Sequence, residues 1–171
     1  PDTDITDTTN TLTLANTYTD TAGNTGVTNT SANYEIDTLK PDISNNLITP
    51  IPNKQGISLS TIFKLNFNQP VLLDTVGGSE TTKIHLQKWD GTSSYTTIKA
   101  LDSVSNSASI TNTTSGSNYF SVINFATSLE YDISYQISVG TNFYKDSNSQ
   151  FFPGLVYSDW NFKTAAQPKG V

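Results

Sequence analysis

Cysteine and methionine are both absent from this 171-residue chain. Without cysteine the protein can form neither disulfides nor thiolate metal sites, and either redox compartment is compatible with it. Charged residues are scarce at 14%, and hydrophobic residues reach only 35%, which is low for a globular protein. Thr, Ser and Asn fill the gap, and aromatic residues contribute 11%. This uncharged polarity, with ample Thr, Tyr, Phe and Val, favours a folded β protein with a polar exterior.

A basic surface is also missing. The formal net charge is -6 and the sequence pI is about 4.5, and the nine Lys and Arg residues form no cluster. Nucleic-acid binding needs a basic face, so we exclude it, and a divalent cation is the more natural electrostatic partner. No run of 18 apolar residues occurs, so we expect no membrane insertion. No signal peptide is present, and the chain opens at Pro1 in mid-pattern, which indicates a fragment of a longer protein.

Alternation of apolar and polar residues dominates the sequence, and helical periodicity is nearly absent. The longest example covers residues 131–139, where every second residue is apolar. A period of two places one face of a strand in a core and the other in water, as in antiparallel sheets. The best helical candidate, residues 125–132, is short. Many short strands separated by turn clusters predict an all-β fold, a β-sandwich.

A change in composition predicts a boundary between Asp37 and Asp42. Residues 1–40 are rich in Thr and Asn and too polar to bury a core of their own. They are expected to form either a β-hairpin that packs on the larger unit or a remnant of a neighbouring repeat, followed by a linker. Residues 41–165 carry a full set of strands and form the main domain. Residues 166–171 are expected to be an exit linker.

Four segments of the main domain resemble a known family. They are Leu59–Val71, Leu129 with Tyr131–Val139, Lys145–Asp146, and Trp160–Thr164. In this order they are similar to the Ig-like domain of bacterial S-layer proteins and of giant RTX-type surface adhesins. The match covers roughly residues 41–165. It departs at residues 146–150, where members of that family carry a Gly-Asn pair after the Asp.

The opening segment resembles a related repeat. Residues 18–26, then Tyr34–Thr38 and Pro41, are similar to the last two strands and exit linker of the tandem Ig-like repeats in calcium-dependent adhesins. The two resemblances imply an Ig-like antiparallel β-sandwich with Greek-key connections. They also imply a secreted protein at the cell surface, with neighbouring Ig-like repeats of the same chain as partners and Ca²⁺ at the repeat junctions.

The segment Asp20–Gly26, with sequence DTAGNTG, has two interpretations. Gly23 suits the positive φ of a hairpin connection, and Asp and Asn side chains often bond to nearby backbone in such turns. Alternatively, the turn contributes oxygens to a calcium ion at the repeat junction, since Ca²⁺ binds six to eight oxygens from carboxylates, amides and carbonyls. The candidate calcium ligands are Asp37 and Asp42 beside the linker, with Asp20, Asn24 and Glu35 as further contributors.

The first ten residues offer a second ion candidate, through Asp2, Asp4 and Asp7. Their spacing of two or three is similar to the start of a calcium loop. The segment lacks the Gly at the sixth position and the Glu at the twelfth that an EF-hand requires. Solvated acid at a chain end is the alternative interpretation.

Sequence motifs for catalysis are missing. His85 is the only histidine, and no nucleophile elbow or histidine pair accompanies it. We therefore expect a surface position for His85 and no enzymatic activity. Most large aromatic residues, including Trp89 and Trp160, are expected in the core rather than in a carbohydrate platform.

Four aromatic residues around Pro153–Gly154 lie on a predicted loop, where exposed rings are costly without a partner. They are the candidate ligand-binding residues Tyr144, Phe151, Phe152 and Tyr157. They form either a binding tip or a cluster that packs back onto the sandwich.

The sequence thus predicts a non-catalytic Ig-like module of a large secreted bacterial surface adhesin. Its expected role is to extend or present a binding region, with calcium stiffening its junctions. One alternative is a ligand-binding module at the adhesin tip, with a cell-surface glycan or protein as its partner. Another is an accessory domain of a secreted hydrolase or an S-layer protein.

Overall fold

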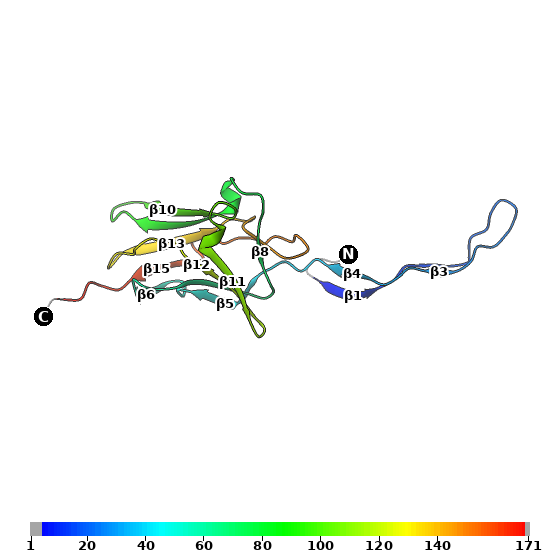
Figure 1. The fold of residues 1–171 in the computed structure, drawn as a ribbon, viewed down its shortest axis with the longest axis horizontal. Coiled ribbons are helices and arrows are strands. Elements are labelled where there is room, and N and C mark those ends of the chain that lie inside the picture. Colours follow the sequence, from blue (N-terminus) through cyan, green and yellow to red (C-terminus); the bar gives the residue numbers. More distant parts are fainter. Residues whose placement is uncertain (1–4, 170–171) are drawn as a thin grey trace. The chain divides into compact units, whose positions relative to one another are not determined.

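A computed structural model describes residues 5–169, without the side chains of Asn45 and Asn46. The chain forms two compact units, Pro1–Leu39 and Lys40–Val171, which we call the N-terminal unit and the C-terminal unit and describe separately (Figure 1). Nearly all regular structure is β, which confirms the predicted all-β class. No helix among the described residues has the length and apolar character needed to cross a membrane.

The N-terminal unit consists of two short antiparallel ribbons. One pairs β1 (Thr6–Asn10) with β4 (Tyr34–Asp37), and the other pairs β2 (Thr13–Leu14) with β3 (Asn29–Thr30). The Asn33 side chain joins the strands of the first ribbon. Its Oδ1 accepts from the Asn10 backbone N–H at 2.7 Å, and its Nδ2 donates to the Thr8 carbonyl at 2.7 Å.

No hydrophobic side chain is buried in the described part of the N-terminal unit. Leu12 is 69% exposed and Val27 is 76% exposed. Backbone pairing and side-chain hydrogen bonds therefore shape this unit, because its described residues form no apolar interior.

The charge of the chain is divided unevenly between the units. Six of the fifteen acidic residues, and none of the nine lysines, precede Lys40. The C-terminal unit therefore holds nine acidic residues and nine lysines. The whole formal charge of -6 belongs to the N-terminal unit.

The C-terminal unit contains two large sheets. One has the strand order β11-β12-β7-β5 and the other has the order β10-β9-β13-β15-β6. The bounds of the first are β5 (Ile43–Thr49), β7 (Phe63–Phe67), β11 (Ile110–Ser115) and β12 (Asn118–Ile123). Those of the second are β6 (Lys54–Ile57), β9 (Lys83–Trp89), β10 (Tyr95–Asp102), β13 (Ser134–Val139) and β15 (Asn161–Thr164).

Smaller elements complete the C-terminal unit. Strands β8 (Leu72–Leu73) and β14 (Tyr144–Lys145) pair with each other, and two single-turn 3₁₀ helices are η1 (Glu80–Thr82) and η2 (Ser107–Ser109). The helical candidate at residues 125–132 forms no helix. Its residues connect β12 to β13 across the end of the sandwich.

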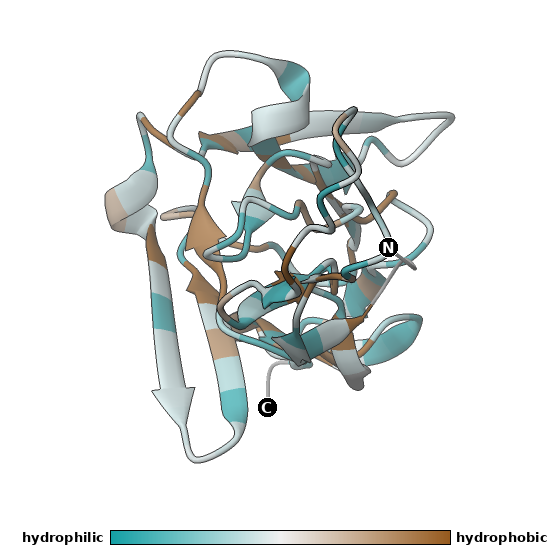
Figure 2. Cartoon of the chain, turned by 90° about the vertical axis from the view of Figure 1, so that its right-hand side faces the viewer, coloured by the Kyte–Doolittle hydropathy of each residue, from teal (hydrophilic) through white to brown (hydrophobic). Residues whose placement is uncertain are grey.

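One hydrophobic core lies between the two large sheets, so the C-terminal unit is a β-sandwich. Along β7 the side chains of Phe63, Leu65 and Phe67 point inward, and along β13 those of Tyr135, Ile137 and Val139 do so. Both hydrophobic (brown) and polar (white or teal) segments occur along the strands (Figure 2). The alternation in the sequence therefore identified the buried face of both sheets.

Trp160 is the largest fully buried side chain. Its indole Nε1 donates to the Pro50 carbonyl at 3.1 Å, so its single polar atom is satisfied. The ring of Phe63 lies against both Trp160 and Phe162, with centroid distances of 6.4 and 6.0 Å. The other tryptophan was wrongly predicted to be in the core: Trp89, at the end of β9, is half-buried and packs against Tyr95.

The chain enters the first strand of the C-terminal unit at one end of the sandwich and leaves the last strand at the other end (Figure 1). Strand β5 begins at Ile43, which pairs with Phe67 at one end of β7. Strand β15 follows Trp160, runs beside Phe63 at the other end of β7, and ends at Thr164. Strand β15 pairs in parallel with β6, through Phe162 with Lys54 and Thr164 with Ile57.

Candidate functional site

The Asp20–Gly26 segment is a hairpin turn closed by the Asp20 carboxylate. Its Oδ1 accepts from the backbone N–H groups of Ala22 and Asn24 at 2.9 Å each, and its Oδ2 accepts from the Asn24 side chain at 2.8 Å. The hydrogen bond from the Asn24 side chain is the main reason that the pKa of Asp20 lies below its usual value. Gly23 has φ +87°, as the turn interpretation requires.

The other acidic candidates of the N-terminal unit do not converge. Asp37 accepts from Thr6 Oγ1 at 3.0 Å and from the Leu39 N–H at 3.1 Å. Asp7 pairs with Ile36, the residue before Asp37. Because side chains alternate along a strand, the Asp7 and Asp37 side chains lie on opposite faces of the ribbon. Asp7 accepts from the Thr9 N–H, and Glu35 is exposed on β4. Asp2 and Asp4 lie outside the described residues.

Asp42 belongs to the C-terminal unit, whereas Asp37 belongs to the N-terminal unit. The Asp42 Oδ1 accepts from the Ile43 N–H at 2.7 Å. Across residues 5–169, no three Asp, Glu or His side chains gather closely enough to hold a metal ion. The calcium site, including a junction site with Asp37 and Asp42, stays a prediction.

The four candidate aromatic residues divide into two groups. Tyr144 and Phe152 are fully buried, and the Phe67 ring lies 5.0 Å from the Tyr144 ring and 5.3 Å from that of Phe152. The Tyr144 and Ser121 hydroxyls share a buried hydrogen bond of 2.7 Å. Phe151 and Tyr157 are half-buried. Of the two interpretations, packing back onto the sandwich describes Tyr144 and Phe152, which present no ring to a ligand.

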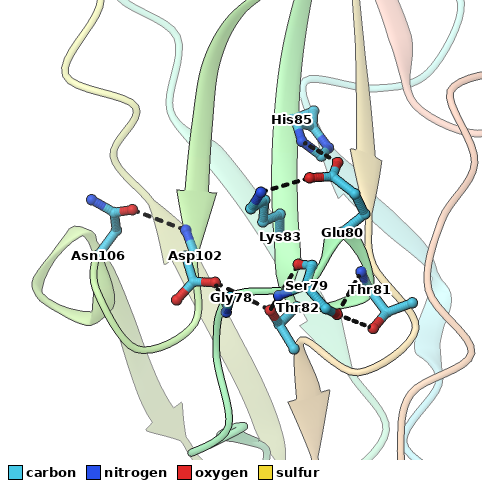
Figure 3. A network of polar contacts seen from close by, with 9 residues as sticks. All are labelled: Gly78, Ser79, Glu80, Thr81, Thr82, Lys83, His85, Asp102 and Asn106. Carbon is cyan, nitrogen blue, oxygen red and sulfur yellow. Dashed lines mark hydrogen bonds and ion pairs between the residues drawn. The ribbon is translucent and has the colours of Figure 1, made fainter.

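His85 lies on the outer face of β9, among polar side chains around η1 (Figure 3). Its Nε2 is 3.2 Å from Glu80 Oε2, and Lys83 Nζ is 2.6 Å from Glu80 Oε1. The two contacts, and above all the hydrogen bond from Lys83, lower the pKa of Glu80. Glu80 is mainly solvent-exposed, so this cluster is a surface charge network.

The Asp102 carboxylate, at the end of β10, is buried next to this charge network (Figure 3). This carboxylate was not identified from the sequence. Its Oδ2 accepts from the Gly78 N–H at 2.7 Å and from Thr82 Oγ1 at 3.1 Å. Its Oδ1 accepts from the N–H groups of Val104 and Ser105 at 3.0 and 3.1 Å. These donors, with Gly78 first, lower the pKa of Asp102 to about 2.

Close packing around Asp102 leaves no room for larger residues. A Cβ added to Gly77 would lie 2.3 Å from Asp102 Oδ1, and one added to Gly140 would lie 2.2 Å from the Thr81 carbonyl oxygen. The hydrogen bonds of Asp102 therefore tie the η1 loop to the β10–η2 turn.

A second missed feature is the ion pair between Asp74 and Lys145. Lys145 Nζ is 3.0 Å from Asp74 Oδ1, and the side chains are only 18% and 7% exposed. The pair connects the chain after β8 to β14. A nearby turn is closed by Asp146, whose Oδ1 accepts from the N–H groups of Asn148 and Gln150 at 2.8 Å. The turn therefore forms without the Gly-Asn pair.

Only some of the Asp102 hydrogen bonds could have been predicted from the sequence. The four-residue spacing between Asp102 and Asn106 is typical of side-chain-closed turns, and Asn106 Oδ1 does accept from the Asp102 N–H. The hydrogen bonds from Gly78 and Thr82 join residues that are 24 and 20 positions from Asp102 in the sequence. No local sequence pattern predicts such contacts.

No protein-family model matches the chain, and no curated protein matches it.

Proposed function

We propose that the chain is a non-catalytic, Ig-like spacer module of a large secreted bacterial surface adhesin, with neighbouring Ig-like repeats of the same chain as its partners. The observation that carries the proposal is the position of the strand ends. The beginning of β5 and the end of β15 lie at opposite ends of the sandwich. A module with this geometry adds its own length to the chain.

The order of the strands supports the Ig-like, Greek-key part of the proposal. After β5 in one sheet, the chain crosses to β6 in the other sheet and returns to β7. It then crosses to β9 and β10, returns to β11 and β12, and crosses again to β13 and β15. Repeated crossing between two mainly antiparallel sheets is a property of Greek-key sandwiches.

The direction of the terminal strands supports a mechanical role. Tension applied at Lys40 and Ala165 would act along β5 and β15, because each strand points toward the end where it leaves the sandwich. β15 is bonded on both sides, to β13 antiparallel and to β6 in parallel. Extracting it lengthwise would break both rows of hydrogen bonds together rather than one after another.

Single-molecule force spectroscopy tests the spacer role. Tandem copies of the chain, pulled through their termini, should show one cooperative unfolding event for each C-terminal unit. About 120 ordered residues should add about 40 nm of extended chain, at about 3.5 Å per residue. The N-terminal unit, which has no buried hydrophobic residues among those described, should extend at low force without such an event.

The direction of pulling provides the control. Cysteines introduced by Thr92→Cys and Ser117→Cys, in the turns after β9 and β11, allow the same unit to be pulled without loading β5 and β15 lengthwise. The unfolding force should then be lower. Equal forces in both directions, or gradual extension without an unfolding event, would contradict the spacer proposal.

Calcium stiffening of the junction is the second part of the proposal. It is supported by the concentration of all the excess acidic charge in the N-terminal unit and by the resemblance of that unit to calcium-dependent repeats. One site at a calcium concentration 100 times its Kd would stabilise the folded chain by about 2.7 kcal/mol. Melting curves in calcium and in EDTA, with Asp37→Ala in calcium, test this. Identical curves and no heat of calcium binding would exclude the site while leaving the spacer role intact.

A further inference from the structure

The sheet that contains β9, β13 and β15 has a shallow hollow of about 250 Å³. Its lining includes Tyr95 from the start of β10, Ser134 from β13, Asn161 and Lys163 from β15, and residues 53–55 around the start of β6. Apart from the tyrosine ring, the side chains named here are amides, a hydroxyl and amines. A ligand that fits this hollow must therefore form hydrogen bonds.

A row of polar side chains crosses the same face of the sheet. Strand register places Thr97 beside Gln87, Gln87 beside Gln136, and Gln136 beside Asn161, so the four side chains point to one side. Gln136 Nε2 donates to Gln87 Oε1 at 2.6 Å, and Gln87 Nε2 donates to Thr97 Oγ1 at 3.0 Å. The amide groups are therefore held in fixed orientations.

The row ends at Asn161 with an acceptor available for a ligand. The Asn161 Nδ2 donates to the Ser158 carbonyl at 2.9 Å, which fixes the amide plane. Its Oδ1 accepts no hydrogen bond from any described residue. A hydroxyl group in the hollow can donate to that oxygen.

An aromatic pair stands beside this row. Tyr95 pairs with Trp89 across the strands, and their ring centroids are 5.1 Å apart with an interplanar angle of 59°. Both rings are half-buried, and neither belongs to the core. Trp89 therefore supports the Tyr95 ring at the rim of the hollow, where its remaining surface can contact the apolar face of a ring-shaped ligand.

The charge of the hollow is positive. Lys163 is paired with Asp132 at 2.7 Å, but Lys54 is exposed and forms no ion pair with any residue from 5 to 169. No acidic residue lines the hollow. A carboxylate on the ligand would complement the positive charge of Lys54.

We propose that this face binds a glycan containing uronic-acid residues. Tyr95 contacts the face of the sugar ring, Asn161 and Ser134 bond to its hydroxyls, and Lys54 pairs with its carboxylate. An aromatic ring beside fixed amides suits a sugar, which presents an apolar C–H face and a rim of hydroxyls. The proposed glycan site is separate from the loop that carries Phe151 and Tyr157. Glycan binding in the hollow does not depend on the spacer role.

The test is an NMR titration of the isotope-labelled full chain with oligogalacturonate and with neutral galacto-oligosaccharide of equal length. The acidic oligomer should shift the amide signals of Tyr95, Asn161 and Lys54 and should bind more tightly than the neutral one. Tyr95→Ala should weaken binding of both about tenfold, because the ring supplies the apolar contact to the sugar face. Lys54→Gln should remove only the preference for the acidic oligomer.

Two further variants make the result decisive. Asn161→Asp preserves shape and places a negative charge in the hollow, so it should abolish binding of the acidic oligomer even if Tyr95→Ala fails to fold. Leu72→Ser, at an exposed position on β8, should bind like the unaltered chain. The proposal is overturned if neither oligomer shifts these signals, or if Asn161→Asp binds the acidic oligomer as the unaltered chain does.

Discussion

The two units of this chain are both built from β-strands, yet different forces hold them. In the described part of the C-terminal unit, twenty hydrophobic residues are buried and form one core. In the N-terminal unit, side chains such as Asn33 and Asp20 bond to nearby backbone, and large apolar residues such as Val27 are exposed. One unit is stabilised by its interior and the other by its local hydrogen bonds.

This contrast shows that strand pairing alone does not make an independently stable domain. An isolated two-stranded ribbon is marginal in water, because each hydrogen bond replaces one to solvent and little apolar surface is removed. The charges follow the same division, since six uncompensated acids fall in the unit without a core. Without calcium, changes to the C-terminal unit should therefore alter global stability, and changes to the N-terminal unit should stay local.

The largest effect should come from Trp160→Ala. The substitution removes the largest buried side chain and leaves the Pro50 carbonyl without its donor, so the free energy of unfolding should fall by about 3–5 kcal/mol. Urea unfolding followed by Tyr fluorescence measures this. Trp89→Ala, at the half-buried tryptophan, should cost only about 0.5–1.5 kcal/mol. Equal losses at the two positions would mean that the core is not centred on Trp160.

A smaller loss is expected from Lys145→Met. The substitution leaves the Asp74 carboxylate buried without its ammonium partner, which should lower the free energy of unfolding by about 2–4 kcal/mol. Lys163→Met breaks the more exposed pair with Asp132 and should leave the urea midpoint nearly unchanged. If Lys145→Met also leaves it unchanged, the Asp74–Lys145 pair contributes nothing to the C-terminal unit.

Asp102→Asn should lower the free energy of unfolding by about 1–3 kcal/mol, because an amide nitrogen then faces N–H donors. It should also change the acid response. The pKa of Asp102 falls from 3.8 to about 2 on folding, so its contribution is complete above pH 4 and is lost as the pH falls toward 2. The variant should lose this part of the pH dependence. Parallel stability curves for both proteins between pH 5 and 2 would refute this role.

The smallest global effect belongs to Asp20→Ala in the N-terminal unit. The substitution removes the acceptor for the N–H groups of Ala22 and Asn24, so hydrogen exchange at these two amides should become faster. The melting temperature of the C-terminal unit should not change. A shift of that melting temperature would show that the two units are energetically coupled and would break the comparison.

The sequence predicted the sandwich because its evidence is repeated at every second residue. Phe63–Phe67 and the later half of 131–139 form inner faces as expected. Trp89 was misplaced because its position at the end of β9, beside the Asp90 turn, leaves part of the ring in solvent. Alternation in the sequence predicts on which face of the sheet a side chain lies, but it does not predict how far along the strand the core extends.

Sites were harder to predict than strands. The turn at Asp20 is local, so its Asp, Gly and Asn could be recognised from seven residues. The Asp102 contacts to Gly78 and Thr82 and the Gln87–Gln136 pair join residues 20 to 49 positions apart. Such contacts depend on strand order and register, which single-sequence periodicity does not supply.

The buried hydroxyl of Tyr144, bonded to Ser121, sets an alkaline limit for the C-terminal unit. Burial raises the pKa of Tyr144 above its ordinary value of 10.0, so the folded protein keeps this phenol protonated where the unfolded chain would release the proton. Stability is therefore lost as the pH rises above 10. Phenolate absorbs ultraviolet light at longer wavelength than phenol, so in an alkaline titration the Tyr144 ring should keep the absorbance of a phenol until the sandwich unfolds. Tyr135, whose pKa is also raised by burial, should titrate late as well. The ultraviolet absorbance of Tyr144 therefore reports unfolding of the sandwich at high pH.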